Sequence, residues 1–397
     1  MFKNKLLIMA PVIALVVVFI FSLTLFPTVQ PQAKNLPIAI VNEDEGVEVP
    51  GQPQMNMGQT IVDNVQKSTS TEEDSPVQWI EVTDADAVQQ GLDQQQYYAA
   101  LVIPQDFSAK QVSLQSPEPS SPEVQIYINQ GMHMAASTAA SQILSGIIDN
   151  MNVNVRNQIL EGFEAQGQTL TPEQASLLAM PIVKNVINVN EVGQNSANGN
   201  APVSLFQPLW IGSLATAAII FMASSKMLLR TKKESLMLKI GQILIGAVAA
   251  LVIGFALTWI VDGMVGLNIP EFYDTAIFLS ITALSYLLMI LAVMSLVGFK
   301  GIAVFALLLF FGAPLLSLAP EMLSPFYHDY IYSWLPMRFM VEGLRPILFF
   351  GQGLSWNSDL SVLMWIGIVS MLVILATAVR AVKVQKDHEH QTAEAAN

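Results

Sequence analysis

Residues 276–299 read AIFLSITALSYLLMILAVMSLVGF, a stretch that carries no charged side chain. An α-helix rises about 1.5 Å per residue, so about 20 apolar residues are enough to cross the ~30 Å hydrocarbon layer of a membrane. Four other stretches of similar length and composition lie at residues 205–229, 240–261, 301–319 and 360–379. None of the five has an acidic residue in its interior, and we predict that each is a transmembrane helix.

A sixth apolar stretch, residues 6–26, follows Lys3 and Lys5 near the start of the chain. A secretory signal peptide also begins with basic residues and is the alternative interpretation. The stretch is longer than the roughly 7 to 15 residues of a signal-peptide core, and the FPTVQ that follows has no small-x-small cleavage site. We therefore predict an uncleaved anchor in residues 1–28 and six transmembrane helices in total.

The composition agrees with a membrane protein. Hydrophobic residues make up 52% of the 397 residues and charged residues only 12%, about half the charged share of an ordinary soluble domain. The formal net charge is -13, and there is no cysteine. Without disulfides, any exported part must be stabilised by its own hydrophobic core.

The basic residues near the ends of the apolar stretches predict the orientation, because lysine and arginine are retained on the cytoplasmic side. With six helices, 11 of them fall on one side: Lys3, Lys5, Lys226, Arg230, Lys232, Lys233, Lys239, Lys300, Arg380, Lys383 and Lys386. We expect both termini in the cytoplasm, with residues 383–397 as a tail. Residues 27–204 contain 20 acidic and five basic residues, a net charge of -15, and are expected outside the cytoplasm. This acidity argues against nucleic acid as a partner.

The exported region, residues 29–202, is predicted to be an α/β domain. Short apolar or alternating runs indicate strands at residues 37–42, 77–82, 97–103 and 124–128, and an extended segment at 183–192. Helical spacing and capping residues indicate helices at 84–95, 132–164 and 173–178. A polar hinge, residues 193–202, leads into the membrane block at 203–382.

Catalytic motifs are absent from the sequence. It contains no Gly-Lys dipeptide, and therefore no phosphate-binding loop of the P-loop ATPases. It also contains no His-Glu-x-x-His, no Gly-x-Ser-x-Gly and no cysteine nucleophile. We predict neither an enzyme nor a cofactor or metal site.

Three segments of the membrane block are candidates for function. Gly246, Ala250 and Gly254 recur every four residues, a pattern that allows close helix packing within the chain or a dimer face. In the cytoplasmic segment 230–239, Arg230, Lys232, Lys233 and Lys239 lie beside an apolar Leu-Met-Leu patch. That segment is either a short helix on the membrane surface or a simple consequence of positive-inside topology.

The third segment, residues 320–358, is predicted to be amphipathic and to dip into the outer face of the membrane. Arg338, Glu342 and Arg345 are spaced four and three residues apart, which allows ion pairs along one face of a helix.

Three stretches carry a resemblance to a known family: LPIAIVNEDEG at 36–46, YAALVIPQDFS at 98–108 and LPMRFMVEGLR at 335–345. With the order of helices and exported domain, they resemble the permeases of type-2 ABC exporters, and more narrowly the phage infection protein (YhgE/Pip) family. The resemblance implies a lipid-embedded homodimer or paired permease that moves a hydrophobic or envelope-directed substrate outward. It also implies a separate cytoplasmic ATPase, for which residues 230–239 are the expected contact. The alternative is a non-transporting envelope protein for adhesion, assembly or phage docking, anchored by its helices.

Overall fold

The computed structural model describes residues 33–48, 54–69, 75–165, 167 and 169–394, together with positions 15, 18, 19, 22, 29 and 31. The side chains of residue 311 and of residues 379–394 are outside this description. The predicted first membrane helix, residues 1–28, also lies outside it except for isolated positions. The chain divides into two compact units. The helical unit comprises Met1–Gln30, Gly193–Ser317 and Pro325–Asn397, and the α/β unit comprises Pro31–Val192 and Leu318–Ser324.

The α/β unit is built on one five-stranded sheet. Its strands are β1 (Leu36–Asn42), β2 (Val77–Glu81), β3 (Ala99–Ile103), β4 (Glu123–Asn129) and β5 (Val183–Val189). Their order across the sheet is β2-β1-β3-β4-β5, and only the β3–β4 pair is antiparallel. These strands confirm the predicted runs to within a few residues. Their order could not be predicted, because it depends on pairings between distant segments.

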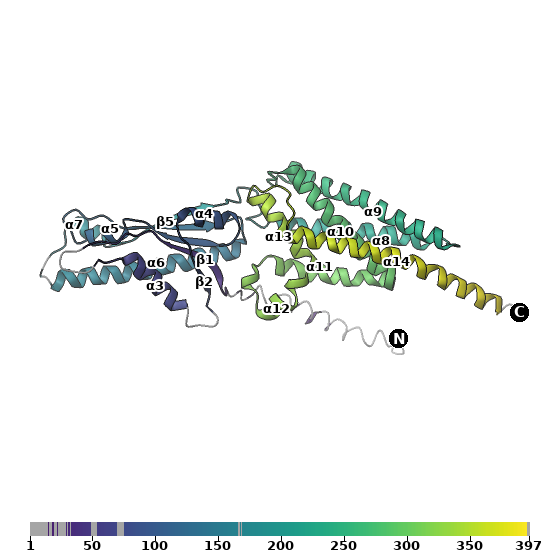
Figure 1. The fold of residues 1–397 in the computed structure, drawn as a ribbon, viewed down its shortest axis with the longest axis horizontal. Helices are drawn as coiled ribbons and strands as arrows, with labels where there is room; N and C mark the ends of the chain where they lie inside the picture. Colours follow the sequence, from purple (N-terminus) through teal and green to yellow (C-terminus); the bar gives the residue numbers. More distant parts are fainter. Residues whose placement is uncertain are drawn as a thin grey trace. The chain divides into compact units, whose positions relative to one another are not determined.

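Helices connect successive strands and cover the sheet (Figure 1). They are α3 (Met57–Thr69), α4 (Ala85–Asp93), α5 (Phe107–Ser113), α6 (Met134–Ala165) and α7 (Pro172–Leu177). Val88 and Leu92 of α4 pack on Ala39 and Val102 of the sheet. Side chains alternate along a strand, so Ile38 and Ile40 face the opposite side, where α3 and α6 contact the sheet. Helices α4, α6 and α7 were predicted, whereas α3 and α5 were not.

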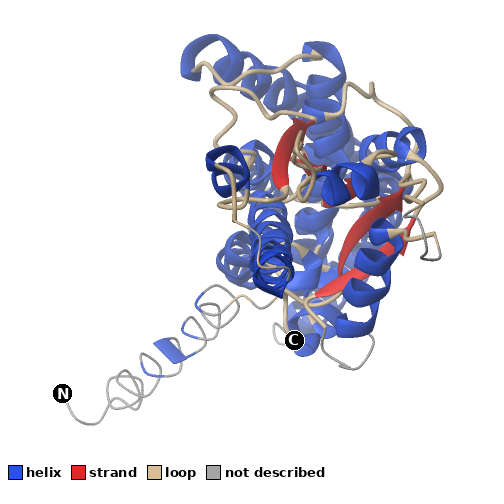
Figure 2. Ribbon diagram, turned by 90° about the vertical axis from the view of Figure 1, so that its left-hand side faces the viewer, coloured by secondary structure: helices blue, strands red, loops and turns tan. Residues whose placement is uncertain are grey.

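The helical unit contains five helices that are long and apolar enough to cross a membrane. They are α8 (Ala201–Ser225), α9 (Lys232–Ile260, continued by the π-helical η1, Val261–Val265), α10 (Phe272–Val297), α11 (Ile302–Leu316, preceded by the 3₁₀ turn η2, Phe299–Gly301) and α14 (Ser358–Glu394). Between α11 and α14 lie α12 (Pro325–Tyr330), the 3₁₀ turn η4 (Tyr332–Trp334) and α13 (Pro336–Phe349). The five predicted helices after residue 200 are thereby confirmed as candidate spans. Figure 2 shows how far helix predominates over strand.

Helix α10 forms the centre of the helical unit. It contacts α8, α9, α13 and α14, and 72% of its most apolar stretch is buried, against 22% for α9. Trp210 of α8 packs on Tyr286 of α10, with ring centroids 4.8 Å apart, and its indole N–H donates to the carbonyl of Phe305 at 3.1 Å. These contacts join α8, α10 and α11.

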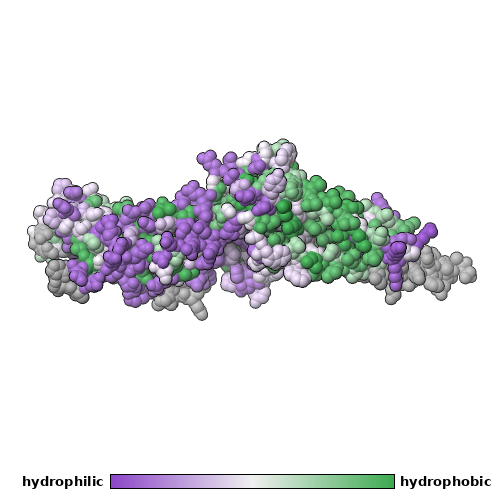
Figure 3. Space-filling view, turned by 45° about the horizontal axis from the view of Figure 1, so that its top comes forward, coloured by the Kyte–Doolittle hydropathy of each residue, from purple (hydrophilic) through white to green (hydrophobic). Residues whose placement is uncertain are grey.

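The outward surface of the helical unit is apolar. Hydrophobic residues gather over it in Figure 3, whereas hydrophilic residues predominate over the α/β unit. On α9, Leu244, Ile245, Val248 and Val252 are each more than 60% exposed. A soluble protein rarely exposes so large an apolar area, so this surface fits contact with lipid.

The segment Leu318–Ser324 differs from expectation. It connects two parts of the helical unit, yet it belongs to the α/β unit. Its 3₁₀ turn η3 (Pro320–Met322) carries Glu321. The Tyr98 hydroxyl donates to Glu321 Oε2 at 2.8 Å, and the backbone N–H of Lys34 donates to the Glu321 carbonyl at 3.0 Å. The segment 320–358, expected to be a single piece, is therefore divided, because its first residues belong to the α/β unit and the rest to the helical unit. Its dip into the outer face of the membrane stays a prediction.

Candidate functional site

Helix α13 is enclosed in the helical unit. It begins at Pro336, a favoured first helical residue because proline has no N–H to leave unpaired, and it contacts α8, α10, α11 and α14. Ten of its residues are buried: Pro336, Met337, Phe339, Met340, Val341, Gly343, Leu344, Arg345, Ile347 and Leu348. A helix with apolar residues around most of its surface packs inside a protein rather than lying at an interface. The sequence pattern that we interpreted as amphipathic thus belongs to a helix inside the helical unit, with a few charged side chains.

Those charged side chains form a polar cluster. Arg345 is only 1% exposed, and its Nε lies 3.9 Å from Glu342 Oε2. The Arg345 Nη1 also donates to the carbonyl of Gly199, just before α8, at 3.5 Å. The Tyr332 hydroxyl donates to Glu342 Oε1 at 2.8 Å. Burial, and then the nearby Glu342 carboxylate, raise the pKa of Tyr332 well above its ordinary value, so its hydroxyl keeps the proton that it donates.

The four-residue spacing of Arg338 and Glu342 predicted an ion pair, but Arg338 lies over aromatic rings. Its guanidinium carbon lies 4.5 Å from the ring centroid of Phe339 and 5.3 Å from that of Tyr332, within cation–π range. The structure therefore gathers Arg338, Glu342 and Arg345 around Tyr332. Buried ionisable groups with specific charged partners commonly mark functional positions.

The α8–α9 connection and the first two turns of α9 contain the four basic residues singled out above. Thr231 caps α9 by accepting from the N–H of Glu234 at 3.1 Å, and Glu234 Oε2 accepts from the N–H of Arg230 at 2.8 Å. The Oγ of buried Ser235 donates to the Ala378 carbonyl of α14 at 2.8 Å. We call residues 226–235 the α8–α9 hairpin. Its ends are held by hydrogen bonds, so it is a compact turn.

The basic residues of this segment separate into two groups. Arg230, Lys232 and Lys233 are exposed on the hairpin. Lys239 is half-buried, and its Nζ donates to Ser295 Oγ near the end of α10 at 3.3 Å. A separate surface helix over residues 230–239 is wrong, because residues 232–239 are the first two turns of α9 itself.

The small residues of α9 face α10. A Cβ added to Gly246 would lie 2.8 Å from Leu287 Cδ2, and one added to Gly254 would lie 2.6 Å from the Ser280 nitrogen. Ala250, between them, is 1% exposed. Of the two uses that the spacing allows, the fold places this face in packing within the chain.

In the α/β unit, two of the quoted sequence stretches meet at Asp44. This carboxylate is 6% exposed and accepts from the backbone N–H of Gly58 at 3.0 Å and of Ser108 at 2.9 Å. It also accepts from the Ser108 hydroxyl. Gly58 and Ser108 lie in the first turns of α3 and α5, where backbone N–H groups have no partner within the helix. One carboxylate therefore accepts hydrogen bonds from the N-termini of two helices. Sequence reasoning identified only a polar turn here, since neither helix had been predicted.

Comparison with protein families decides the identity. Residues 5–379 match the family model described as ABC-2 family transporter protein. The chain belongs to this family. No curated protein sequence matches it significantly. Among solved structures, a crystal structure of a domain from a candidate ABC type-2 transporter of Thermotoga maritima MSB8 is 20% identical, covers 38% of this chain and 86% of its own, and has a TM-score of 0.25. That score is too low to support conclusions.

As an ABC-2 family transporter protein, the chain is a multi-pass membrane protein and a component of a transport system. The match confirms the resemblance to type-2 ABC permeases at the level of the family. No three His, Asp or Glu side chains among the described residues are grouped so as to hold a metal ion.

Proposed function

We propose that this ABC-2 family protein is the membrane permease subunit of an exporter whose ATPase is a separate chain. The observation that carries the proposal is the family match over residues 5–379, which includes both units. The sequence has no Gly-Lys dipeptide and hence no P-loop, which supports a separate chain as the source of ATP hydrolysis. The substrate class that we propose is hydrophobic or envelope-directed.

In the proposed topology six helices cross the membrane, both termini are cytoplasmic and residues 27–204 are outside. The distribution of basic residues supports it. We also propose that the phage infection protein branch is the narrower family and that the permease acts as a homodimer or a pair. The three quoted stretches support the first point, and two of them lie together at Asp44 and Ser108.

The α8–α9 hairpin is the proposed contact for the ATPase. Arg230, Lys232 and Lys233 are exposed there, and Leu228 is 85% exposed. Exposed charges set the rate and specificity of association, and an apolar neighbour adds affinity. Capping hydrogen bonds already order this turn, so a bound ATPase could move α9 without first having to order the connection.

Co-purification from the native host tests this proposal. The full-length wild-type chain is expected to bring down a P-loop chain with measurable ATPase activity. Lys232→Glu combined with Lys233→Glu should reduce the bound ATPase by at least about tenfold, because each reversal replaces an attraction by a repulsion. Lys300→Glu is the matched control, since it is an exposed lysine in the other short connection predicted to be cytoplasmic.

Two results would oppose the proposal. One is a wild-type chain that brings down no P-loop protein, together with a deletion strain whose efflux is unchanged for every compound tried. The other is full function of a chain reduced to residues 1–204, which would favour the envelope protein that the helices only anchor.

A further inference from the structure

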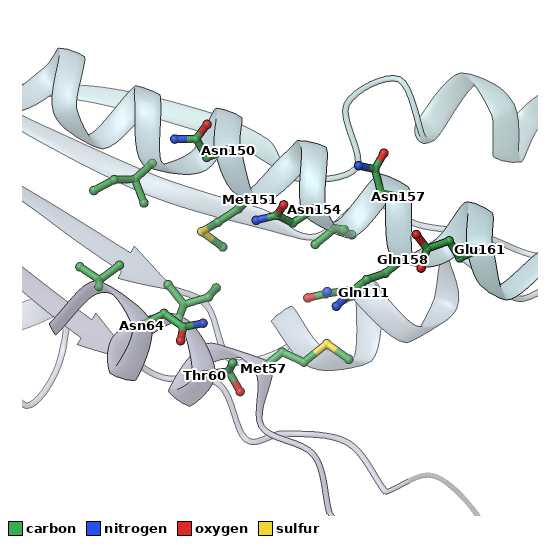
Figure 4. A pocket seen from close by; sticks show the side chains of 14 residues that line it. Met57, Thr60, Asn64, Gln111, Asn150, Met151, Asn154, Asn157, Gln158 and Glu161 are labelled. Carbon is green, nitrogen blue, oxygen red and sulfur yellow. The ribbon is translucent and has the colours of Figure 1, made fainter. Parts of the chain in front are cut away.

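A cavity of about 760 Å³ opens between α3 and α6 in the α/β unit, with Gln111 of α5 beside it (Figure 4). We call it the α3–α6 groove. Its floor is apolar: Ile61, Val65 and Val155 are buried, and Ile147 and Met151 are half-buried. Nothing in the family match or the proposed export function assigns a role to it.

The rim of the groove is a row of amides. Asn150, Asn154 and Gln158 follow one another at four-residue steps along α6, so they lie on one face about 6 Å apart. Asn64 of α3 faces them from across the groove in Figure 4. None of the side-chain amides of Asn64, Gln111, Asn150, Asn154 and Gln158 bonds to another group in the described part of the chain. Each is available as both donor and acceptor.

The charge of the groove limits its occupant. Among the described residues that line it, Glu161, one turn beyond Gln158, is the only charged one, and none is basic or aromatic. Residues 27–204 carry a net charge of -15. A phosphate, a nucleotide or an anionic lipid head group would be repelled by the acidic charge, and the described lining offers no cation to bind it. The described lining also offers no aromatic ring on which a sugar could stack. The lining favours a neutral or cationic ligand with many amide groups.

An extended peptide has the matching repeat. Two residues of a strand advance about 6.6 Å, close to the ~6 Å between successive amides on α6. The backbone N–H and C=O groups of the peptide that face α6 could therefore hydrogen-bond to one side-chain amide of α6 for every two peptide residues. Side chains that point away from the amides would reach the apolar floor at the same interval, as in other extended-peptide sites.

We propose that the α3–α6 groove binds an extended, neutral or cationic peptide segment with an apolar side chain at every second residue. The row from Asn150 to Glu161 is about 16 Å long, enough for about five residues of such a segment. This proposal does not depend on ATP-driven export, because binding requires only the described α/β unit.

Fluorescence anisotropy with the full-length chain in detergent tests the proposal. The probe is a fluorescein-labelled peptide KVTVTVK, and the comparison peptides are its acidic counterpart EVTVTVE and the rearranged KTTVVVK. We expect saturable binding, tightest for KVTVTVK. Replacing Asn150, Asn154 and Gln158 together by alanine should weaken it at least about tenfold, since each lost hydrogen bond contributes a few-fold.

Gln142→Ala is the control, because Gln142 is another exposed amide of α6 that does not line the groove. The amides replaced are exposed and alanine favours helix, so the variants are expected to fold. The proposal is overturned by equal affinity of the triple variant and the wild type, by absence of saturable binding of KVTVTVK, or by tighter binding of EVTVTVE.

Discussion

At the scale of single residues, Asp44 joins parts of the α/β unit that are far apart in the sequence. It lies two residues after the end of β1, and its carboxylate accepts from Gly58 in α3 and from Ser108 in α5. The N-termini of helices present unpaired N–H groups and a partial positive charge, and a carboxylate satisfies both. A polar residue after a strand is common, so the sequence alone does not distinguish this role from that of a solvated turn.

We expect Asp44→Ala to lower the free energy of unfolding of the α/β unit by about 3 kcal/mol, because it leaves the N–H groups of Gly46, Gly58 and Ser108 without their acceptor. Pulse proteolysis of the full-length chain in urea measures this change. Asp63→Ala is the control, since Asp63 is exposed on α3, where its carboxylate accepts from the side chain of Gln59. Equal destabilisation by the two variants would contradict the assigned role.

Arg345 is the second decisive residue, because a nearly fully buried guanidinium must be compensated. Arg345→Met should lower the midpoint of thermal unfolding in detergent, since the Glu342 carboxylate then lacks the facing charge. Adding Glu342→Leu to Arg345→Met should restore part of the loss, because replacing both members of a buried pair by apolar residues is often neutral. A double variant no better than the single one would show that the pair is not energetically coupled.

At the scale of elements, hydropathy predicted the membrane helices well but not their boundaries or contacts. For residues 230–239 the sequence allowed either a separate surface helix or only a positive-inside loop, and residues 232–239 instead begin α9 itself. The capped turn at Thr231 explains this, because a helix that begins there has no reason to end before the apolar stretch. The small residues of α9 show the same limit. Their spacing predicted a packing face, and the fold decides that α10 occupies it.

Gly254 tests that packing. Its missing side chain would lie 2.6 Å from the Ser280 nitrogen and 2.7 Å from the Ala276 carbonyl oxygen, both backbone atoms that are not free to shift. Gly254→Ala should therefore lower the thermal midpoint of the detergent-solubilised chain. Gly241→Ala, in open space on the same helix, should leave it unchanged or raise it slightly, because alanine favours helix by about 1 kcal/mol over glycine. Tolerance of Gly254→Ala would mean that α9 and α10 are not so close.

At the scale of the whole molecule, the orientation in the membrane determines whether the proposed ATPase contact is accessible to a cytoplasmic partner. The chain has no cysteine, so single introduced cysteines report their own accessibility without a background. Asp86 on α4 and Lys233 on the α8–α9 hairpin are both exposed.

In protoplasts, a membrane-impermeant maleimide is expected to label Asp86→Cys and to leave Lys233→Cys unlabelled, because the membrane separates the two sides. Both should be labelled once the membrane is disrupted, which controls for reactivity. Labelling of Lys233→Cys in intact protoplasts would reverse the topology and remove the proposed site of ATPase contact.

The sequence by itself determined the membrane class, five candidate spans and most of the α/β elements, because hydrophobic length and alternation are local properties of the chain. Helix α3 was missed, since only Ile61, Val62 and Val65 are buried hydrophobic residues along it. Tertiary structure alone decided that Asp44 meets Ser108, that Arg345 reaches Gly199 and that Glu321 binds Tyr98. These partners are 64, 146 and 223 residues apart, so their pairing depends on how the elements pack and leaves no local pattern in the sequence.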